Sequence, residues 1–240
     1  MLLGTLTPYL IVFTASACGL IIEILAGRLL APSIGVSLYT WTAIIGVVLA
    51  GISTGSYLGG QLADRFPSPT TLGLILLAAG ISSLAVLPLE GSVSHAFEVL
   101  PPVSEIIVLT AVLFFLPSLL LGMVTPVVIK LRLRDLAHTG NVVGKIYSLS
   151  AAGSIFGTFI TGFVLIQLIG TRSTLILVAI LLVLMALAFG NLWRAKLPSL
   201  ASLVILVGLG ATGFASGTLE SSCLRRWVFL LHRRCHRGFR

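Results

Sequence analysis

The chain has 240 residues, of which 57% are hydrophobic and only 9% are charged, and its formal net charge is +8. Its mean hydropathy is +1.13. So much apolar surface cannot be buried in one water-soluble core, which excludes an ordinary soluble enzyme or binding module. We therefore predict an all-α polytopic membrane protein, because helices satisfy their own backbone hydrogen bonds in lipid.

Apolar runs of membrane-spanning length follow one another along the chain. A bilayer requires roughly 20 apolar residues per helix, so the sequence indicates about seven transmembrane helices. In chain order they cover residues 9–30, 42–60, 72–89, 106–128, 146–169, 175–192 and 200–219. Glycine and serine interrupt the last run, which either spans or forms a re-entrant or interfacial segment. We assign 1–219 to a transmembrane helical domain and 220–240 to a basic juxtamembrane tail.

Basic residues in the loops predict the orientation of the helices, since Lys and Arg of short loops stay on the cytoplasmic side. One side of the membrane would hold only Arg28 and Arg172, together with an acidic loop. The other side would hold seven basic residues, Arg65, Lys130, Arg132, Arg134, Lys145, Arg194 and Lys196. We therefore expect the N-terminus in the cytoplasm, and we place the protein in the cytoplasmic (inner) membrane of a prokaryote.

The C-terminal tail conflicts with this orientation if the seventh run spans. It carries six arginines, Arg225, Arg226, Arg233, Arg234, Arg237 and Arg240. Three explanations stay open: the seventh run does not span, the tail crosses despite its charge, or the tail is not a natural continuation of the coding frame. As a juxtamembrane strip, Arg225 and Arg226 would contact anionic lipids or a partner protein. The same holds for Lys130, Arg132 and Arg134. We expect no nucleic-acid partner.

Cysteine and histidine residues are few. Cys18 lies inside the first run, while Cys223 and Cys235 flank the basic tail, so no disulfide framework is indicated. His232, Cys235 and His236 lie close in sequence but lack a second ligand pair, and we assign no metal. The chain has no haem or iron–sulfur ligand set, and we expect no cofactor.

Two glycine ridges mark the second and fifth runs. Gly51, Gly55 and Gly59 recur every four residues and so lie on one helix face, and Gly153 and Gly157 form a comparable ridge three runs later. Small residues let membrane helices approach closely, so both ridges predict tight helix packing. Their spacing suggests a three-plus-three internal repeat, as transporter halves have.

Glu23 is the ionisable residue inside an otherwise apolar run, where a carboxylate is costly. It is our candidate for an intramembrane ion or substrate site, together with Arg28. Two alternatives compete with this function: Glu23 and Arg28 form a structural pair at the outer interface, or Glu23 caps the turn that follows the run. The position of Glu23 near the predicted helix end favours these structural roles.

Pro117 and Pro126 interrupt the fourth run. Proline removes a helical hydrogen bond, so we expect each to kink or end the helix. The freed carbonyl groups would then face a polar cavity beside Ser118 and Thr125, or simply accompany packing kinks.

The second run ends in GSYLGGQLADRF, and its G-x-x-x-A-D-R ending resembles the cytoplasmic loop between helices two and three of the major facilitator superfamily (MFS). A wider resemblance covers about 8–192 and rests on three blocks in order, EILAGRLLAPSIGVSLYTWTAIIGVVLAGISTGSYLGGQLADR, PSLLLGMVTPVVIKL and TGNVVGKIYSLSAAGSIFGTFITGFVLIQLIGTR. These blocks are similar to the membrane domain of fused MFS/spermidine synthase-like proteins. The resemblance implies a half-MFS-like 3+3 helix bundle plus one extra helix. It also implies that Asp64 and Arg65 clamp neighbouring helices, against the alternative of a solvated turn.

In that family the membrane domain precedes an aminopropyltransferase-like domain, which acts on polyamines and decarboxylated S-adenosylmethionine. Asp and Glu number only seven here and give no evident pair for amine activation, so we expect no catalysis by this chain alone. We rank first a non-catalytic membrane scaffold or accessory subunit that anchors a partner protein. The alternatives are a half-transporter that dimerises through its glycine ridges and moves a polyamine, and a membrane subunit of an aminopropyltransferase. The partners are thus lipids and another membrane-associated protein, or a second copy.

Overall fold

A computed structural model of the chain describes residues 6–96, 101–132 and 139–190, with the side chains of 92–96 left out. Within these ranges, six helical segments are long and apolar enough to cross a membrane. The seventh run at 200–219 and the tail lie outside the described residues. The helices are α1 (Thr7–Ile34), α2 (Leu38–Arg65), α3 (Pro69–Ala96), α4 (Pro102–Arg132), α5 (Thr139–Ile160), which continues through the π-helix η2 (Thr161–Leu165) into α6 (Ile166–Ile169), and α7 (Thr171–Phe189).

Glycine and hydroxyl residues set the boundaries between successive helices. Gly35 ends α1 with a φ of 73°, a conformation that glycine adopts without a steric penalty. Two residues later the Ser37 hydroxyl accepts a hydrogen bond from the backbone N–H of Thr40 and caps α2. Gly170, with a φ of 80°, separates α6 from α7 in the same way.

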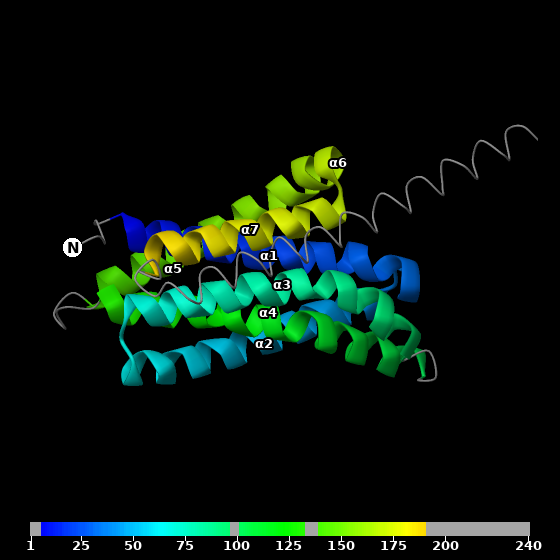
Figure 1. Cartoon of the computed structure of the whole chain (residues 1–240), viewed down its shortest axis with the longest axis horizontal. Helices are drawn as coiled ribbons and strands as arrows, with labels where there is room; N and C mark the ends of the chain where they lie inside the picture. The colour runs from blue at the N-terminus through cyan, green and yellow to red at the C-terminus, as the bar shows by residue number, and fades with distance from the viewer. Residues whose placement is uncertain (1–5, 97–100, 133–138, 191–240) are drawn as a thin grey trace, which may run out of the picture.

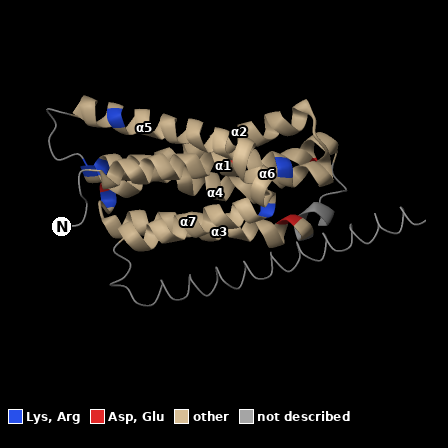
Figure 2. Cartoon of the chain, turned by 90° about the horizontal axis from the view of Figure 1, so that it is seen from above, with Lys and Arg blue, Asp and Glu red and all other residues tan. Residues whose placement is uncertain are grey.

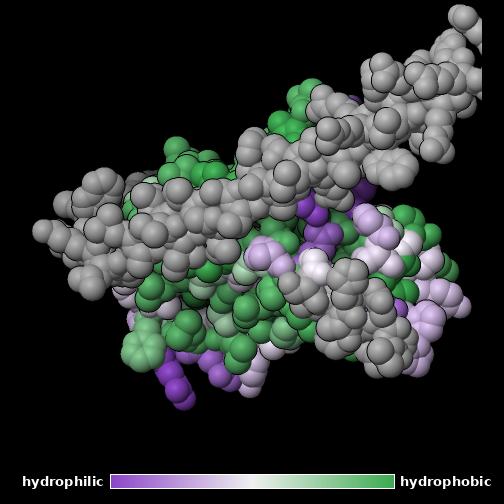
Figure 3. All heavy atoms as spheres, turned by 45° about the vertical axis from the view of Figure 1, so that its right-hand side comes forward, coloured by the Kyte–Doolittle hydropathy of each residue, from purple (hydrophilic) through white to green (hydrophobic). Residues whose placement is uncertain are grey.

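The helices run roughly along the long axis of the molecule (Figure 1). Seen from above, α1 and α4 make the middle layer, α2 and α5 lie on one side of it, and α3 and α7 lie on the other (Figure 2). Lys and Arg gather toward the two ends of the helices, and the stretch between the ends is almost free of them (Figure 2). Hydrophobic residues also make up most of the described surface visible in Figure 3. A large exposed apolar surface is what a lipid-facing bundle requires.

The glycine ridge of α2 lies against α4. A Cβ on Gly55 would overlap the backbone carbonyl oxygen of Leu119, and one on Gly59 would lie 2.6 Å from the Cα of Met123. The α4 side of this contact has its own glycine, because a Cβ on Gly122 would lie 2.5 Å from the carbonyl oxygen of Ile52. The ridge therefore brings the two backbones into direct contact, as predicted from its spacing.

The ridge of α5 lies against α1 in the same register. A Cβ on Gly153 would overlap the carbonyl oxygen of Phe13, and one on Gly157 would lie 2.5 Å from that of Ala17. Both partners advance by four residues, as Leu119 and Met123 do opposite the ridge of α2. The two contacts are thus equivalent, and the partners in each run parallel.

The pairing of the helices is symmetric between the first three spans and the last three. The most extensive pairings are α2 with α4, α1 with α5 and α3 with α7. If α1, α2 and α3 are exchanged with α4, α5 and α7 in order, the pairing of α2 with α4 becomes that of α5 with α1. The pairing of α3 with α7 is unchanged by the same exchange. Since successive spans alternate in direction, the first and fourth spans run in opposite directions, so the packing has the pattern of an inverted three-plus-three repeat.

Two expectations need correction here. The glycine ridges are filled by helices of the same chain, so they are not free surfaces for dimerisation. Of the two outcomes expected for Pro117 and Pro126, an end to the helix is wrong, because α4 continues from Pro102 to Arg132, whereas a kink stays a prediction. Because Pro126 has no N–H, the carbonyl group of Gly122 lacks its helical donor. It accepts a hydrogen bond from the Ser56 hydroxyl of α2 instead, at 3.3 Å.

Candidate functional site

Glu23 lies deeper in its helix than the sequence suggested. α1 continues to Ile34, four residues beyond the predicted end, which places Glu23 about three turns before the end of the helix. The side chain is half-buried, and its neighbours Ile22 and Leu25 are fully buried. A carboxylate at this depth in a membrane-length helix is costly and is a candidate for a functional group.

The structure does not join Glu23 to Arg28. Arg28 is exposed, and within the described residues no ion pair links the two side chains. The reason is helical geometry: five residues advance the chain by 500°, so the two side chains point about 140° apart. The predicted structural pair at the outer interface is therefore not formed.

The turn after α1 is also stabilised without Glu23. The backbone N–H of Gly35 donates to the carbonyl oxygen of Ala31, and the Thr40 hydroxyl donates to the carbonyl oxygen of Gly35 at 3.2 Å. The Ser37 and Thr40 hydroxyls lie 3.0 Å apart. These local groups satisfy the turn, so it does not require Glu23 as a cap.

A hydroxyl pair shares the face of α1 that carries Glu23. Ser16 precedes Glu23 by seven residues, close to two full turns, and its hydroxyl lies 2.7 Å from that of Ser150 in α5. One turn after Glu23, Gly27 lies against the Trp41 ring of α2, which is 2.9 Å from a Cβ placed there. We call Ser16 and Glu23 the polar strip of α1. The sequence analysis missed Ser16, although its seven-residue spacing from Glu23 was a usable signal.

An ion pair closes one end of the bundle. The Nζ of Lys130 in α4 donates to the carboxylate of Asp64 in α2 at 2.6 Å, and the two side chains are 46% and 69% exposed. Asp64 thus contacts a neighbouring helix, whereas Arg65 is exposed, and the clamping role of the two residues stays a prediction. At the same end the guanidinium of Arg132 lies over the ring of Tyr9, 5.6 Å from its centroid. Lys130 and Arg132, expected to face lipid or a partner, therefore also make contacts within the chain.

A second ion pair lies at the opposite end. Arg172, in the first turn of α7, is 3.7 Å from the carboxylate of Glu90 in α3. Sequence reasoning missed this contact because it joins residues more than eighty positions apart. Arg134, Arg225 and Arg226 lie outside the described residues. Within the described ranges, His, Cys, Asp and Glu form no group of three suited to a metal ion.

The six helices of membrane-spanning length define a polytopic helical protein, and they are consistent with a membrane protein. Two polyamine aminopropyltransferases of Ralstonia nicotianae are each 27% identical to this chain over 233 residues, which is 93% of it. A polyamine aminopropyltransferase of Leptospira interrogans is 26% identical over 153 residues, 63% of the chain. The chain spans less than half of these relatives, 44% and 42% of the Ralstonia proteins. No family model matches the sequence, and no solved structure matches it.

Proposed function

We propose that this chain is the membrane-embedded part of a polyamine aminopropyltransferase-like system, a non-catalytic scaffold or accessory subunit that anchors the transferase. The observation that carries this proposal is coverage: the similarity includes 93% of this chain but only 44% and 42% of the Ralstonia relatives. More than half of each relative lies outside the similarity, which leaves room for a separate transferase domain. The inverted repeat of the packing supports a half-facilitator architecture for the part seen here.

The distribution of carboxylates supports an anchoring role over catalysis. The acidic residues of the described side chains are four, and each belongs to a different helix: Glu23, Asp64, Glu90 and Glu105. Asp64 and Glu90 are held in ion pairs at opposite ends of the bundle. Activating an amine for aminopropyl transfer needs converging acid–base groups, which such a distribution does not favour.

The basic end of the bundle is the surface where a soluble partner would dock in this proposal. Arg65, Lys130, Arg132 and Lys145 lie toward the end where α1 begins, because α2 and α4 end there and α5 begins there, in keeping with a cytoplasmic N-terminus. Arg65 and Lys145 are exposed. A transferase domain with an acidic face would be held there by complementary charge, and anionic lipids of the inner leaflet would flank it.

Co-purification tests this proposal directly. The chain is extracted from its native membrane into nanodiscs and analysed by native mass spectrometry, with identification of every co-migrating protein and small molecule. A stoichiometric complex with an aminopropyltransferase-like protein supports the scaffold. The double variant Arg65→Glu with Lys145→Glu should weaken that complex, whereas Arg28→Glu at the other end should not. This result would support docking at the basic end of the bundle. Aminopropyl transfer by the purified chain alone would overturn the non-catalytic assignment.

A second function, transport of a polyamine or another small cation, is favoured by one observation. Glu23 is a half-buried carboxylate on the polar strip, and within the described residues no salt bridge neutralises it. A half-facilitator needs a second half to enclose a pathway. Since the glycine ridges are used inside the chain, this twin would meet the outer layer of α2 and α5, which is largely exposed. Spermidine uptake into proteoliposomes that is lost in Glu23→Gln and retained in Glu105→Gln would move transport to first place.

A further inference from the structure

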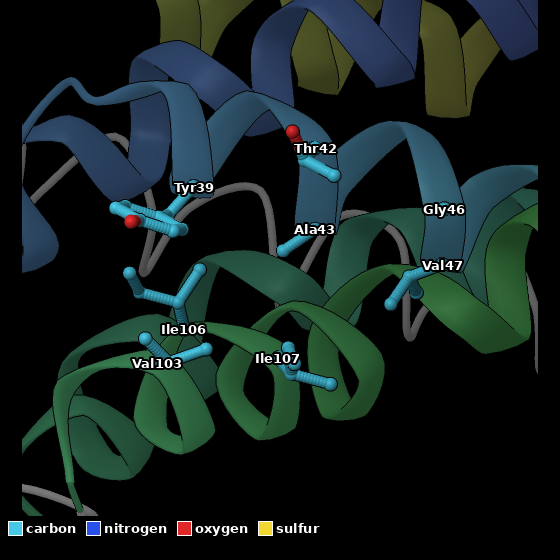
Figure 4. Close-up of a pocket in the computed structure, with 8 residues that line it drawn as sticks. All are labelled: Tyr39, Thr42, Ala43, Gly46, Val47, Val103, Ile106 and Ile107. Atoms are coloured by element: carbon cyan, nitrogen blue, oxygen red, sulfur yellow. The ribbon is translucent and has the colours of Figure 1, made fainter.

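A groove of about 300 Å³ lies between the N-terminal halves of α2 and α4 (Figure 4). Ala43 and Val47 of α2 point toward α4, and Ile106 of α4 points back toward α2 (Figure 4). Those that define it are Tyr39, Ala43 and Val47 of α2, and Val103, Ile106 and Ile107 of α4. The volume is at the lower limit of sites that bind small molecules, and none of these side chains carries a charge.

The interior of the groove offers almost no hydrogen-bonding group. Thr42 belongs to its lining, but the Thr42 hydroxyl donates to the carbonyl oxygen of Leu38 at 2.8 Å. Gly46 adds only bare backbone, and Tyr39, at one end of the groove in Figure 4, has the remaining side-chain hydroxyl. An occupant must therefore be apolar over most of its length, because a buried polar group without a partner is costly.

The size of the groove selects a slim occupant. From Tyr39 to Val47 the lining extends about 12 Å along α2, less than half of the roughly 30 Å hydrocarbon thickness, so it has the depth of one leaflet. A helix is at least about 10 Å wide, and a single 5.4 Å turn would fill about 400 Å³ or more. The groove is too small for a partner helix, whereas a single hydrocarbon chain is thin enough.

The charge at the mouth favours a phosphate group. Tyr39 and Val103 each belong to the first turn of their helix, so the N-termini of α2 and α4 both open at this end of the groove. The Thr40 N–H already donates to the Ser37 hydroxyl and Pro102 has no N–H, so the attraction for a phosphate group would come mainly from the positive ends of the two helix dipoles. Glu105 is also in the first turn of α4, but it is two residues from both Val103 and Ile107 and so lies on the opposite face of the helix.

We propose that this groove is a binding site for one acyl chain of a glycerophospholipid, whose phosphate lies at the mouth beside the N-termini of α2 and α4. The lipid would fill the crevice where these two helices diverge from their close glycine contact. This site is separate from Glu23 and from the basic end of the bundle. The proposal does not depend on whether the chain anchors a transferase or transports a cation.

Photo-labelling of the whole chain tests the site. The protein is reconstituted into nanodiscs that contain a phospholipid with a diazirine in the middle of one acyl chain, and labelled peptides are mapped by mass spectrometry. Gly46→Phe fills the groove, since no atom lies within 4 Å of a Cβ added there. Gly60→Phe is the matched control, because Gly60 lies in the same helix and has equally open space around its Cβ.

In the wild type we expect labels concentrated in the peptides of 39–47 and 103–107. Gly46→Phe should reduce them by about fivefold, equivalent to roughly 1 kcal/mol of binding, while Gly60→Phe leaves them unchanged. Labelling of the exposed α7 residues Leu177 and Leu184 reports the bulk lipid, and thermal unfolding in detergent shows whether each variant is still folded. Equal labelling of the groove and α7, or no difference between the two variants, would overturn the site. An equally strong signal from a diazirine-labelled fatty alcohol would overturn the role of the phosphate.

Discussion

The Ser56 hydroxyl of α2 donates a hydrogen bond to the backbone carbonyl oxygen of Gly122 in α4 at 3.3 Å. This carbonyl is four residues before Pro126, which has no N–H to give it. A side chain on the neighbouring helix thus replaces the hydrogen bond that proline removes. The contact explains how α4 continues through a proline in its C-terminal half.

We predict that Ser56→Ala lowers the stability of the bundle by about 0.6–2 kcal/mol, because the carbonyl group of Gly122 loses its donor. The free energy of unfolding is measured by titration with sodium dodecyl sulfate in mixed micelles. Ser53→Ala is the matched control: Ser53 lies on the same helix and is exposed. It should change the unfolding free energy by less than about 0.5 kcal/mol.

A double-mutant cycle gives a sharper prediction. Pro126→Ala restores a backbone N–H opposite Gly122, so Ser56→Ala should cost less in the Pro126→Ala background than in the wild type. A coupling energy of about 0.5 kcal/mol or more is expected. An equal cost in both backgrounds would mean that the hydroxyl does not compensate for the proline.

The contact between Gly55 and Leu119 leads to a larger predicted effect. A Leu at Gly55 would collide with the backbone of α4, which cannot move as the end of a flexible side chain can. We expect Gly55→Leu to destabilise the bundle by about 3 kcal/mol or more, the upper end of the cost of overpacking. Thermal unfolding in detergent measures this loss. Gly60→Leu, five residues later in open space, should unfold close to the wild type; a similar loss there would contradict the ridge as the cause.

The positions of the helices were largely predictable from the sequence. Apolar runs of about 20 residues located all six described spans, because lipid imposes the same length on every span. Most helices extend beyond these runs: α4 begins at Pro102 and ends at Arg132, whereas the prediction covered 106–128. The end of α7 is the exception, since the helix ends at Phe189 and the predicted run continued to 192. The polar turns at the helix ends continue the helical hydrogen bonding beyond the apolar segment. A search for apolar runs does not detect these turns.

The contacts of the candidate site were less predictable. The glycine spacing indicated tight packing on two helices, but it did not indicate which helix fills each ridge. The partners of Ser16 and Asp64 are 134 and 66 residues away in the sequence. Such pairings depend on the three-layer arrangement, which a single sequence does not encode locally. Glu23 and Arg28 show the opposite error, since proximity in sequence suggested a pair that helical geometry separates.

The ion pair between Asp64 and Lys130 should contribute little to stability despite its 2.6 Å distance. Both side chains are largely exposed, and exposed pairs are screened by water and salt. We predict a coupling energy below about 1 kcal/mol from a double-mutant cycle of Asp64→Asn and Lys130→Met, decreasing further at high salt. A larger, salt-independent coupling would mean that the pair is shielded from water in the membrane, and would favour a role in fixing α2 against α4.

Glu23 should have the opposite effect on stability. Within the described residues no salt bridge balances the Glu23 carboxyl group, so the fold bears the cost either of burying its charge or of protonating it inside a membrane-length helix. We predict that Glu23→Gln raises the free energy of unfolding by about 1–2 kcal/mol in dodecyl sulfate titrations. Glu105→Gln, which removes the same charge at a helix end, should change it by less than about 0.5 kcal/mol. A loss of stability in Glu23→Gln would instead mean that the carboxylate stabilises the bundle through a contact of its own. A gain would identify Glu23 as a residue kept at a cost to the fold, as functional groups often are.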